Sequence, residues 1–149
     1  MLWLISAVLI WLIALLVIRF KGLKRLWSAA VWSIIINYYL YHFFWEKGFY
    51  YFQEITYYLQ GVPFLLLAAM GGLALLVLHF LPDESGWQLL YLVLCGAGLA
   101  LLEFLASWQG LIYYQNWTIL DSFAFKLIMI IAVTQLSNLT IRKHKGYLF

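Results

Sequence analysis

The chain has 149 residues, of which 66% are hydrophobic and only 10% are charged. A soluble domain carries about 25% charged residues, so this composition excludes a soluble domain and indicates a chain surrounded by lipid. The net charge of +3 does not indicate nucleic-acid binding, because the Lys and Arg residues form two short clusters beside apolar runs, where such residues orient membrane helices.

Continuous apolar runs predict an all-α fold, an integral membrane bundle of five transmembrane helices that forms one transmembrane domain over residues 1–149. The predicted spans are residues 2–18, 26–45, 62–81, 87–108 and 119–139. A β-barrel is not expected, because its strands would alternate apolar and polar residues. The single cysteine, Cys95, excludes an intramolecular disulfide.

The two basic clusters predict the orientation of the bundle. One follows the first span and the other forms the tail, and together they hold seven of the nine Lys and Arg residues: Arg19, Lys21, Lys24, Arg25, Arg142, Lys143 and Lys145. Basic loops stay in the cytoplasm, and five spans place both clusters on the same side. We therefore expect the N-terminus outside, the C-terminus inside and a multi-pass protein of the plasma membrane.

Residues 48–60, between the second and third spans, are rich in Tyr and Phe and also contain Gln53, Glu54 and Thr56. Aromatic residues with polar neighbours suit the membrane interface. We expect this outer interfacial segment to form a short helix or loop along the headgroup region. The alternative is an extension of a tilted span.

Small residues four apart occur in the third span, at Ala68 and Gly72, and in the fourth, at Gly96 and Ala100. Such pairs let two membrane helices approach closely. We expect the third and fourth spans to form a tight antiparallel hairpin.

Six polar residues lie in the outer halves of the second, fourth and fifth spans or directly beside them, within about 13 Å of the helix ends at ~1.5 Å rise per residue. They are Asn37, His42, Glu46, Glu103, Asp121 and Lys126. Ionisable groups in spanning helices are costly and face a protein interior or a wet cavity. We interpret these residues as an intramembrane polar cluster whose rim is formed by loop residues Tyr113, Tyr114, Gln115 and Asn116.

Helical spacing predicts which of these groups meet. Asp121 and Lys126 are five residues apart and point away from each other, so we expect Lys126 to pair with Glu103 on another helix. His42 would then meet Asp121 or Glu46. We favour a structural ion pair that locks the bundle; the alternative is a polar pocket, open to the outside, for a headgroup, a small solute or a cation.

The C-terminal third contains Glu103, then Gly110-x-Ile112-x-Tyr114-x-x-Trp117, then Asp121-Ser122. This pattern resembles an uncharacterised family of small multispanning membrane proteins found mainly in spore-forming Gram-positive bacteria. The resemblance implies a bacterial plasma-membrane protein of about five helices, and it implies no activity. The tyrosine run at residues 50–58 has no counterpart in that pattern.

No catalytic motif accompanies the polar cluster, because the sequence has no Gly-x-Ser-x-Gly elbow, no phosphate loop and no paired histidines. We expect no catalytic residues, no metal and no cofactor, and we favour a protein that is not an enzyme. The leading hypothesis is a small non-catalytic subunit or accessory partner of a membrane assembly. Its expected partners are membrane lipids and either another protein or a second copy of the chain, and not nucleic acid.

Two other classes of function stay open. The first is a small transporter or channel component, whose substrate would enter an outer pocket formed by His42, Glu103, Asp121 and Lys126. The second is a membrane enzyme that acts on a lipid-linked substrate, with Glu103 or Asp121 as general acid or base.

Overall fold

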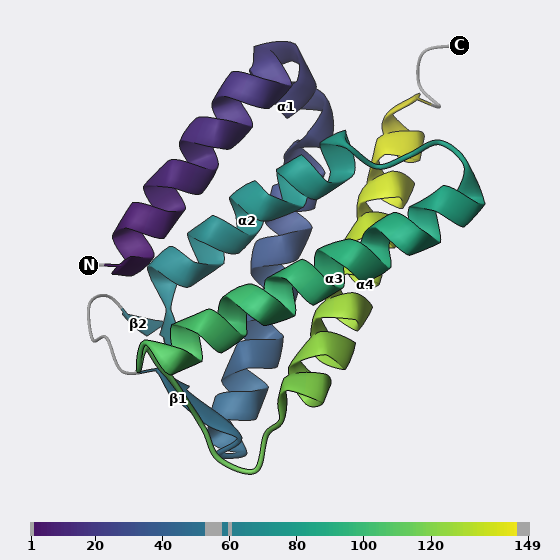
Figure 1. Cartoon of the computed structure of the whole chain (residues 1–149). Helices are drawn as coiled ribbons and strands as arrows, with labels where there is room; N and C mark the ends of the chain where they lie inside the picture. The colour runs from purple at the N-terminus through teal and green to yellow at the C-terminus, as the bar shows by residue number, and fades with distance from the viewer. Residues whose placement is uncertain (1, 53–57, 60, 146–149) are drawn as a thin grey trace.

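The computed structural model describes residues 2–52, 58–59 and 61–145, and this part of the chain is mostly helical (Figure 1). Residues 53–57 and 60 of the predicted interfacial segment lie outside the described residues. In chain order the elements are α1 (Leu2–Glu46), β1 (Tyr50–Phe52), β2 (Tyr58–Leu59), β3 (Val62–Pro63), α2 (Phe64–His79), α3 (Ser85–Trp108), β4 (Ile112–Tyr114) and α4 (Ile119–Lys145).

Helix α1 is broken at a single residue, Arg19, whose φ of 55° and ψ of 160° are not helical. Its first half, residues 2–18, and its second half, residues 20–46, run in opposite directions (Figure 1). The sequence predicts a basic loop between the first two spans. Instead, one residue with non-helical φ and ψ reverses the chain, and the residues after it belong to the helix again.

Three helical stretches are long and apolar enough to cross a membrane, namely Trp3–Phe20, Gly86–Trp108 and Ile119–Ile141. Helix α2 has only 16 residues, which is about 24 Å of helix, less than the ~30 Å hydrocarbon core of a bilayer. The second half of α1 is long, but residues 38–45 of it are rich in Tyr and also contain His and Trp. Helices that are long and apolar enough to cross a membrane are therefore found for three of the five predicted spans.

Helix α2 lies between the two halves of α1. The Trp11 indole N–H in the first half donates to the Ala68 carbonyl at 2.9 Å, and the Ser33 hydroxyl in the second half donates to the Met70 carbonyl at 3.0 Å. A Cβ on Gly72 would lie 2.7 Å from the Ile10 side chain. The absence of a side chain at position 72 therefore allows the close approach between α2 and the first half of α1.

The predicted hairpin of the third and fourth spans is wrong. Helix α2 packs chiefly on α1, and α3 packs on α4. Gly96 faces the backbone of Leu127 in α4 and not α2. Small residues indicate that a helix is approached closely, but they do not say by which neighbour. A hydrogen bond of 3.2 Å from the Tyr91 hydroxyl to the Val77 carbonyl joins α3 to α2.

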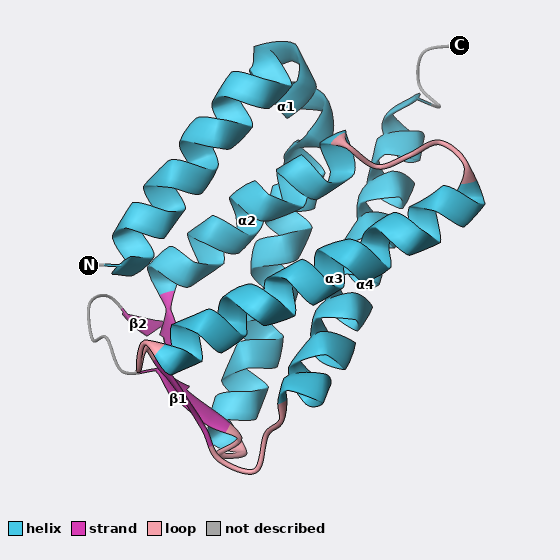
Figure 2. Ribbon diagram, viewed as in Figure 1, coloured by secondary structure: helices cyan, strands magenta, loops and turns pink. Residues whose placement is uncertain are grey.

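Two short antiparallel strand pairs lie at one end of the bundle, β1 with β4 and β2 with β3 (Figure 2). Helices α1 and α3 both end at a glycine with positive φ, Gly48 at 70° and Gly110 at 75°. In each case the following residue, Phe49 or Leu111, donates its N–H to the carbonyl five residues earlier, which is a Schellman helix end. These two ends direct the chain into β1 and β4, so residues 50–52 form a strand and not the expected helix or loop.

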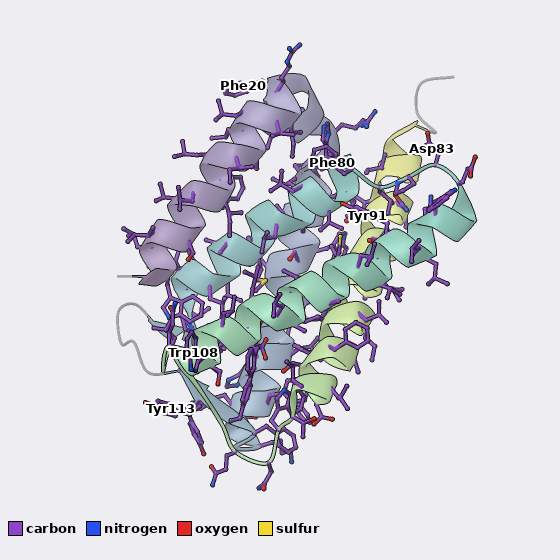
Figure 3. All side chains as sticks on the ribbon, viewed as in Figure 1. Phe20, Phe80, Asp83, Tyr91, Trp108 and Tyr113 are labelled. Carbon is purple, nitrogen blue, oxygen red and sulfur yellow. The ribbon has the colours of Figure 1, made fainter. Side chains whose placement is uncertain are left out.

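The two ends of the molecule differ in the segments that they carry. Figure 3 shows Phe20, Phe80 and Asp83 towards one end, and Trp108 and Tyr113 towards the other. The first end contains the break in α1, the turn before α3 and the end of α4, whereas the strands lie at the second (Figure 1). We call the first the turn end and the second the strand end.

A buried ion pair beside an apolar cavity

The centre of the candidate site is an ion pair between α3 and α4. The Lys126 Nζ lies 2.5 Å from the Glu103 Oε2. The Lys126 side chain is 1% exposed and that of Glu103 is 8% exposed, so both charges are removed from solvent. The pairing that helical spacing predicts for these two residues is therefore present.

Hydroxyl groups bind the second oxygen of the Glu103 carboxylate. Oε1 accepts hydrogen bonds from the Ser122 hydroxyl at 2.7 Å and from the Tyr114 hydroxyl at 3.2 Å. The Trp117 indole N–H donates to the Ser122 oxygen at 2.7 Å and thereby orients that hydroxyl. Helix α4 and the segment before it thus supply the donors that a buried carboxylate needs.

The ammonium group of Lys126 is held by the second half of α1. It donates to the Tyr41 hydroxyl and lies 4.7 Å from the centre of the Tyr41 ring and 5.1 Å from that of Phe125. Attraction between a cation and an aromatic face is strongest where water is excluded. The ion pair therefore joins α1, α3 and α4 at one depth.

Aromatic rings cover this site near the strand end. Phe44 lies 4.8 Å from Trp117 and 4.9 Å from Phe125, measured between ring centres. Phe49 lies 5.5 Å from Trp117. We call these four rings the aromatic cover, and their packing keeps water away from the Glu103 and Lys126 charges on this side.

Tyr114 lies in β4, outside the apolar helices, and its hydroxyl is neutral at physiological pH. Burial and the nearby Glu103 carboxylate together raise the pKa of Tyr114 to about 12. A neutral phenol keeps its proton and can therefore donate a hydrogen bond to the carboxylate. The hydrogen bond from Tyr114 to Glu103 is therefore maintained across the physiological range.

A partly open cavity of about 480 Å³ borders the ion pair. Its walls come from the first half of α1, from α2 and from α3, and they are mainly aliphatic: Leu9, Ile10, Leu66, Ala69, Met70, Leu73, Leu99, Leu102, Leu105 and Ala106. Tyr41, Glu103 and Lys126 also line it, together with Ser6 and Gln109. Its volume falls within the range of about 300–1,000 Å³ typical of ligand pockets.

No family model, curated protein or solved structure matches this chain. The resemblance of the C-terminal third to a family of small membrane proteins therefore stays a prediction. The function has to be inferred from the geometry of the site.

His42 and Glu46 pair with each other on α1. Their side chains lie 3.5 Å apart, one helical turn from each other, and are 26% and 59% exposed. His42 also stacks between the rings of Tyr38 and Trp45, at 5.9 and 6.2 Å. The structure thus places this pair near the strand end of α1. Of the two partners expected for His42, Glu46 is the one that it meets.

Asp121 is exposed and closes the beginning of α4. Its Oδ2 accepts hydrogen bonds from the Thr118 N–H at 2.9 Å and the Thr118 hydroxyl at 2.6 Å. The Thr118 hydroxyl in turn accepts from the Asp121 N–H at 3.3 Å, which is a capping box. Asp121 therefore orders the start of its own helix and lies apart from the ion pair. Among the described residues, no three His, Cys, Asp or Glu side chains are grouped as a metal site would require.

Asn37 is buried, one helical turn further from the strand end than Tyr41. Its Nδ2 donates to the carbonyl and the hydroxyl of Ser33 at 2.8 and 3.2 Å. It lines a separate cavity of about 30 Å³, which Ser33 and Thr134 also border. The structure thus assigns Asn37 to a deeper polar layer than that of Glu103 and Lys126.

Of the four predicted rim residues, Tyr114 reaches the ion pair. Tyr113, Gln115 and Asn116 are exposed. The Gln115 N–H donates to the Phe49 carbonyl at 2.7 Å, and Asn116 has a φ of 58°, so both shape the turn into α4.

Sequence reasoning did not assign Tyr41 to the site and gave no partner to Ser122. Ser122 carries a usable signal, because it lies four residues before Lys126 on the same helix. Tyr41 carries no such signal, because it lies on a different helix from both buried ions. Residues four apart share a helix face. Polar residues on the same face as a buried ion are therefore the natural candidates for its hydrogen-bond partners.

Proposed function

We propose that this chain is a non-catalytic membrane protein that binds one amphiphilic molecule of the membrane in the cavity beside Glu103 and Lys126. The observation that carries the proposal is the cavity itself, with aliphatic walls along most of its length and a charged, hydrogen-bonded group at one place. An aliphatic wall binds a hydrocarbon chain through apolar burial, and an isolated polar group fixes the orientation of its head.

The failure of α2 and α3 to form a hairpin supports this proposal. The two helices both contribute to the walls of the cavity, through residues such as Met70 of α2 and Leu102 of α3. Empty apolar space of this size is unfavourable in a packed protein. A bound hydrocarbon chain would supply the missing contacts.

The proposal includes the five-span topology in the plasma membrane, with the N-terminus outside and the C-terminus inside. One feature of the fold supports it. The basic break in α1 and the end of α4 lie at the same end of the molecule (Figure 1), as the positive-inside rule requires. With this orientation the strand end, the aromatic cover and the ion pair belong to the outer leaflet.

The test is native mass spectrometry of the protein purified in mild detergent, followed by lipid extraction. We expect one bound amphiphile per chain in the wild type. Ala106→Phe fills the cavity that Ala106 lines and should remove the bound molecule. Ala97→Phe places the same ring on an exposed position of the same helix and should retain it. Equal occupancy in both variants, or no bound amphiphile in the wild type, would overturn the proposal.

A role as accessory subunit is a second proposal, supported by the outer face of α3. Leu90, Leu94, Leu101 and Trp108 are all largely exposed on this helix, and a helix of a partner protein would bury them. The same mass spectra test it, because a partner or a second copy adds a defined mass. The transporter alternative has less support, since the cavity that Asn37 and Thr134 line has about 30 Å³, room for about one or two water molecules.

A further inference from the structure

We infer that the amphiphile in this cavity is recognised through a hydroxyl group that donates a hydrogen bond to Glu103. The inference rests on the proposed function and names the class of molecule: a long-chain alcohol or another uncharged lipid with a free hydroxyl. Lipids with an anionic head, and apolar molecules without a donor, would bind less tightly.

The first reason is the hydrogen-bond capacity left on Glu103. A carboxylate has about four acceptor positions, two on each oxygen. Oε1 accepts from Ser122 and Tyr114, and among the described residues Oε2 accepts from Lys126 alone. One acceptor position on Oε2 is therefore available, and Glu103 is the less buried member of the pair, 8% exposed against 1%.

The second reason is the charge of the cavity. Glu103 and Lys126 are the charged residues in its described lining, and each neutralises the other. The ammonium group is also occupied by Tyr41 and lies against two rings. An anionic head would have to approach a carboxylate and gain no unpaired cation, which is unfavourable at low dielectric.

The third reason is the position of the polar group within the cavity. Gln109 and Leu111 border the cavity at the strand end, whereas Leu73 and Leu99 border it further inside. Glu103 lies one helical turn from Leu99 along α3. A hydroxyl at Glu103 would therefore direct an attached hydrocarbon chain along the aliphatic part of the walls.

The experiment compares three probes that share one chain, namely oleyl alcohol, oleate and oleyl methyl ether. Each competes with tritiated oleyl alcohol for the purified wild-type protein at a matched mole fraction in detergent micelles. We expect the alcohol to bind about tenfold more tightly than the other two, the effect of one hydrogen bond to a charged group. The ether lacks the donor, and oleate carries the unfavourable charge.

Two variants assign the preference to Glu103. The double change Glu103→Leu with Lys126→Met removes both charges together, and the three probes should then bind with similar affinity. Gln109→Leu removes another polar lining residue and should keep the preference for the alcohol. A preference that is lost in Gln109→Leu and kept in the double variant would overturn the assignment.

The outcomes separate this inference from the proposed function. If all three probes bind wild type equally, or if oleate binds most tightly, the hydroxyl inference is overturned and the cavity is still an amphiphile site. If none of the probes binds, and no amphiphile is found in the purified protein, the proposed function is overturned as well.

Discussion

Single residues set the energetics of this molecule, above all the two charges of Glu103 and Lys126. Moving a charge from water into a low-dielectric interior costs several kcal/mol even after relaxation. Three hydroxyls, from Tyr41, Tyr114 and Ser122, offset part of this cost by binding the pair. The balance requires both charges, since each one stabilises the other in its buried position.

Changing one member of the pair should therefore be worse than changing both. Glu103→Gln or Lys126→Met alone leaves one buried charge unpaired, and we expect each to lower the free energy of unfolding by about 3–5 kcal/mol. The double variant should lose clearly less, because no unpaired charge remains. Chemical unfolding in detergent measures all four proteins. If the double variant were no more stable than the less stable of the two single variants, this would contradict the coupling.

Tyr114 gives the site a dependence on high pH. Its pKa is raised to about 12 in the folded protein, above the usual value of about 10 for tyrosine. The unfolded chain then loses this proton first, so stability is full below about pH 10 and falls as the pH rises towards 12. Wild type should lose stability relative to Tyr114→Phe over this window. Parallel stability curves from pH 8 to 12 would rule this out.

Arg19 carries backbone strain at the break in α1. Its φ of 55° with a ψ of 160° belongs to a region that glycine occupies readily and other residues occupy at a cost of about 1–3 kcal/mol. Arg19→Gly should therefore raise the stability of the purified protein. Lys24→Gly, in the helix that follows, should lower it by about 1 kcal/mol. Thermal unfolding would distinguish them, and equal losses would show that the break is unstrained.

At the scale of elements, close packing of α2 depends on positions without side chains. A Cβ at Gly72 would lie 2.7 Å from Ile10, whereas at Gly98 it would meet nothing within 4 Å. Gly72→Ala should lower stability by about 1–3 kcal/mol through overpacking. Gly98→Ala should raise it by up to about 1 kcal/mol through helix propensity. If Gly72→Ala were as stable as Gly98→Ala, α2 would not be held closely between the halves of α1.

Sequence patterns predicted where the helices lie in the chain better than they predicted which elements contact one another. Continuous apolar runs are long signals, and helices lie in all five of the predicted ranges. Strands β1 and β4 have three residues each, and they pair across about 60 positions of sequence. Such a pairing depends on two helix ends lying close together in space. A local sequence pattern carries no information about that distance.

The predicted polar cluster shows the same limit. Counting residues from the end of a helix gives the distance of a group from that end. The six residues were predicted to cluster on the basis of this distance alone. Direction around the helix decides contact, and it turns Glu103 and Lys126 inward while Asp121 faces the solvent side. Helical spacing separated Asp121 from Lys126 correctly because both belong to one helix. For residues on different helices, no such relation exists in the sequence.

At the scale of the whole molecule, the number of membrane crossings is decided by α2 and the second half of α1. The other three helical stretches are long and apolar enough to span. If α2 and the second half of α1 also cross, the strand end faces outside. If neither crosses, Lys47 after α1 lies on the same side as the basic break at Arg19.

Accessibility of single cysteines distinguishes these two topologies. In a Cys95→Ser background, Lys47→Cys, Asp83→Cys and Gln115→Cys each place a thiol at an exposed position outside the apolar cores. Five crossings predict that a membrane-impermeant maleimide labels positions 47 and 115 on intact cells and reaches position 83 only after the membrane is opened. Three crossings predict that positions 47 and 83 are both protected on intact cells and that position 115 is labelled. Helix α2 is shorter than the hydrocarbon core. Labelling of position 47 on intact cells, together with protection of position 83, would show that the chain nevertheless crosses the membrane along α2.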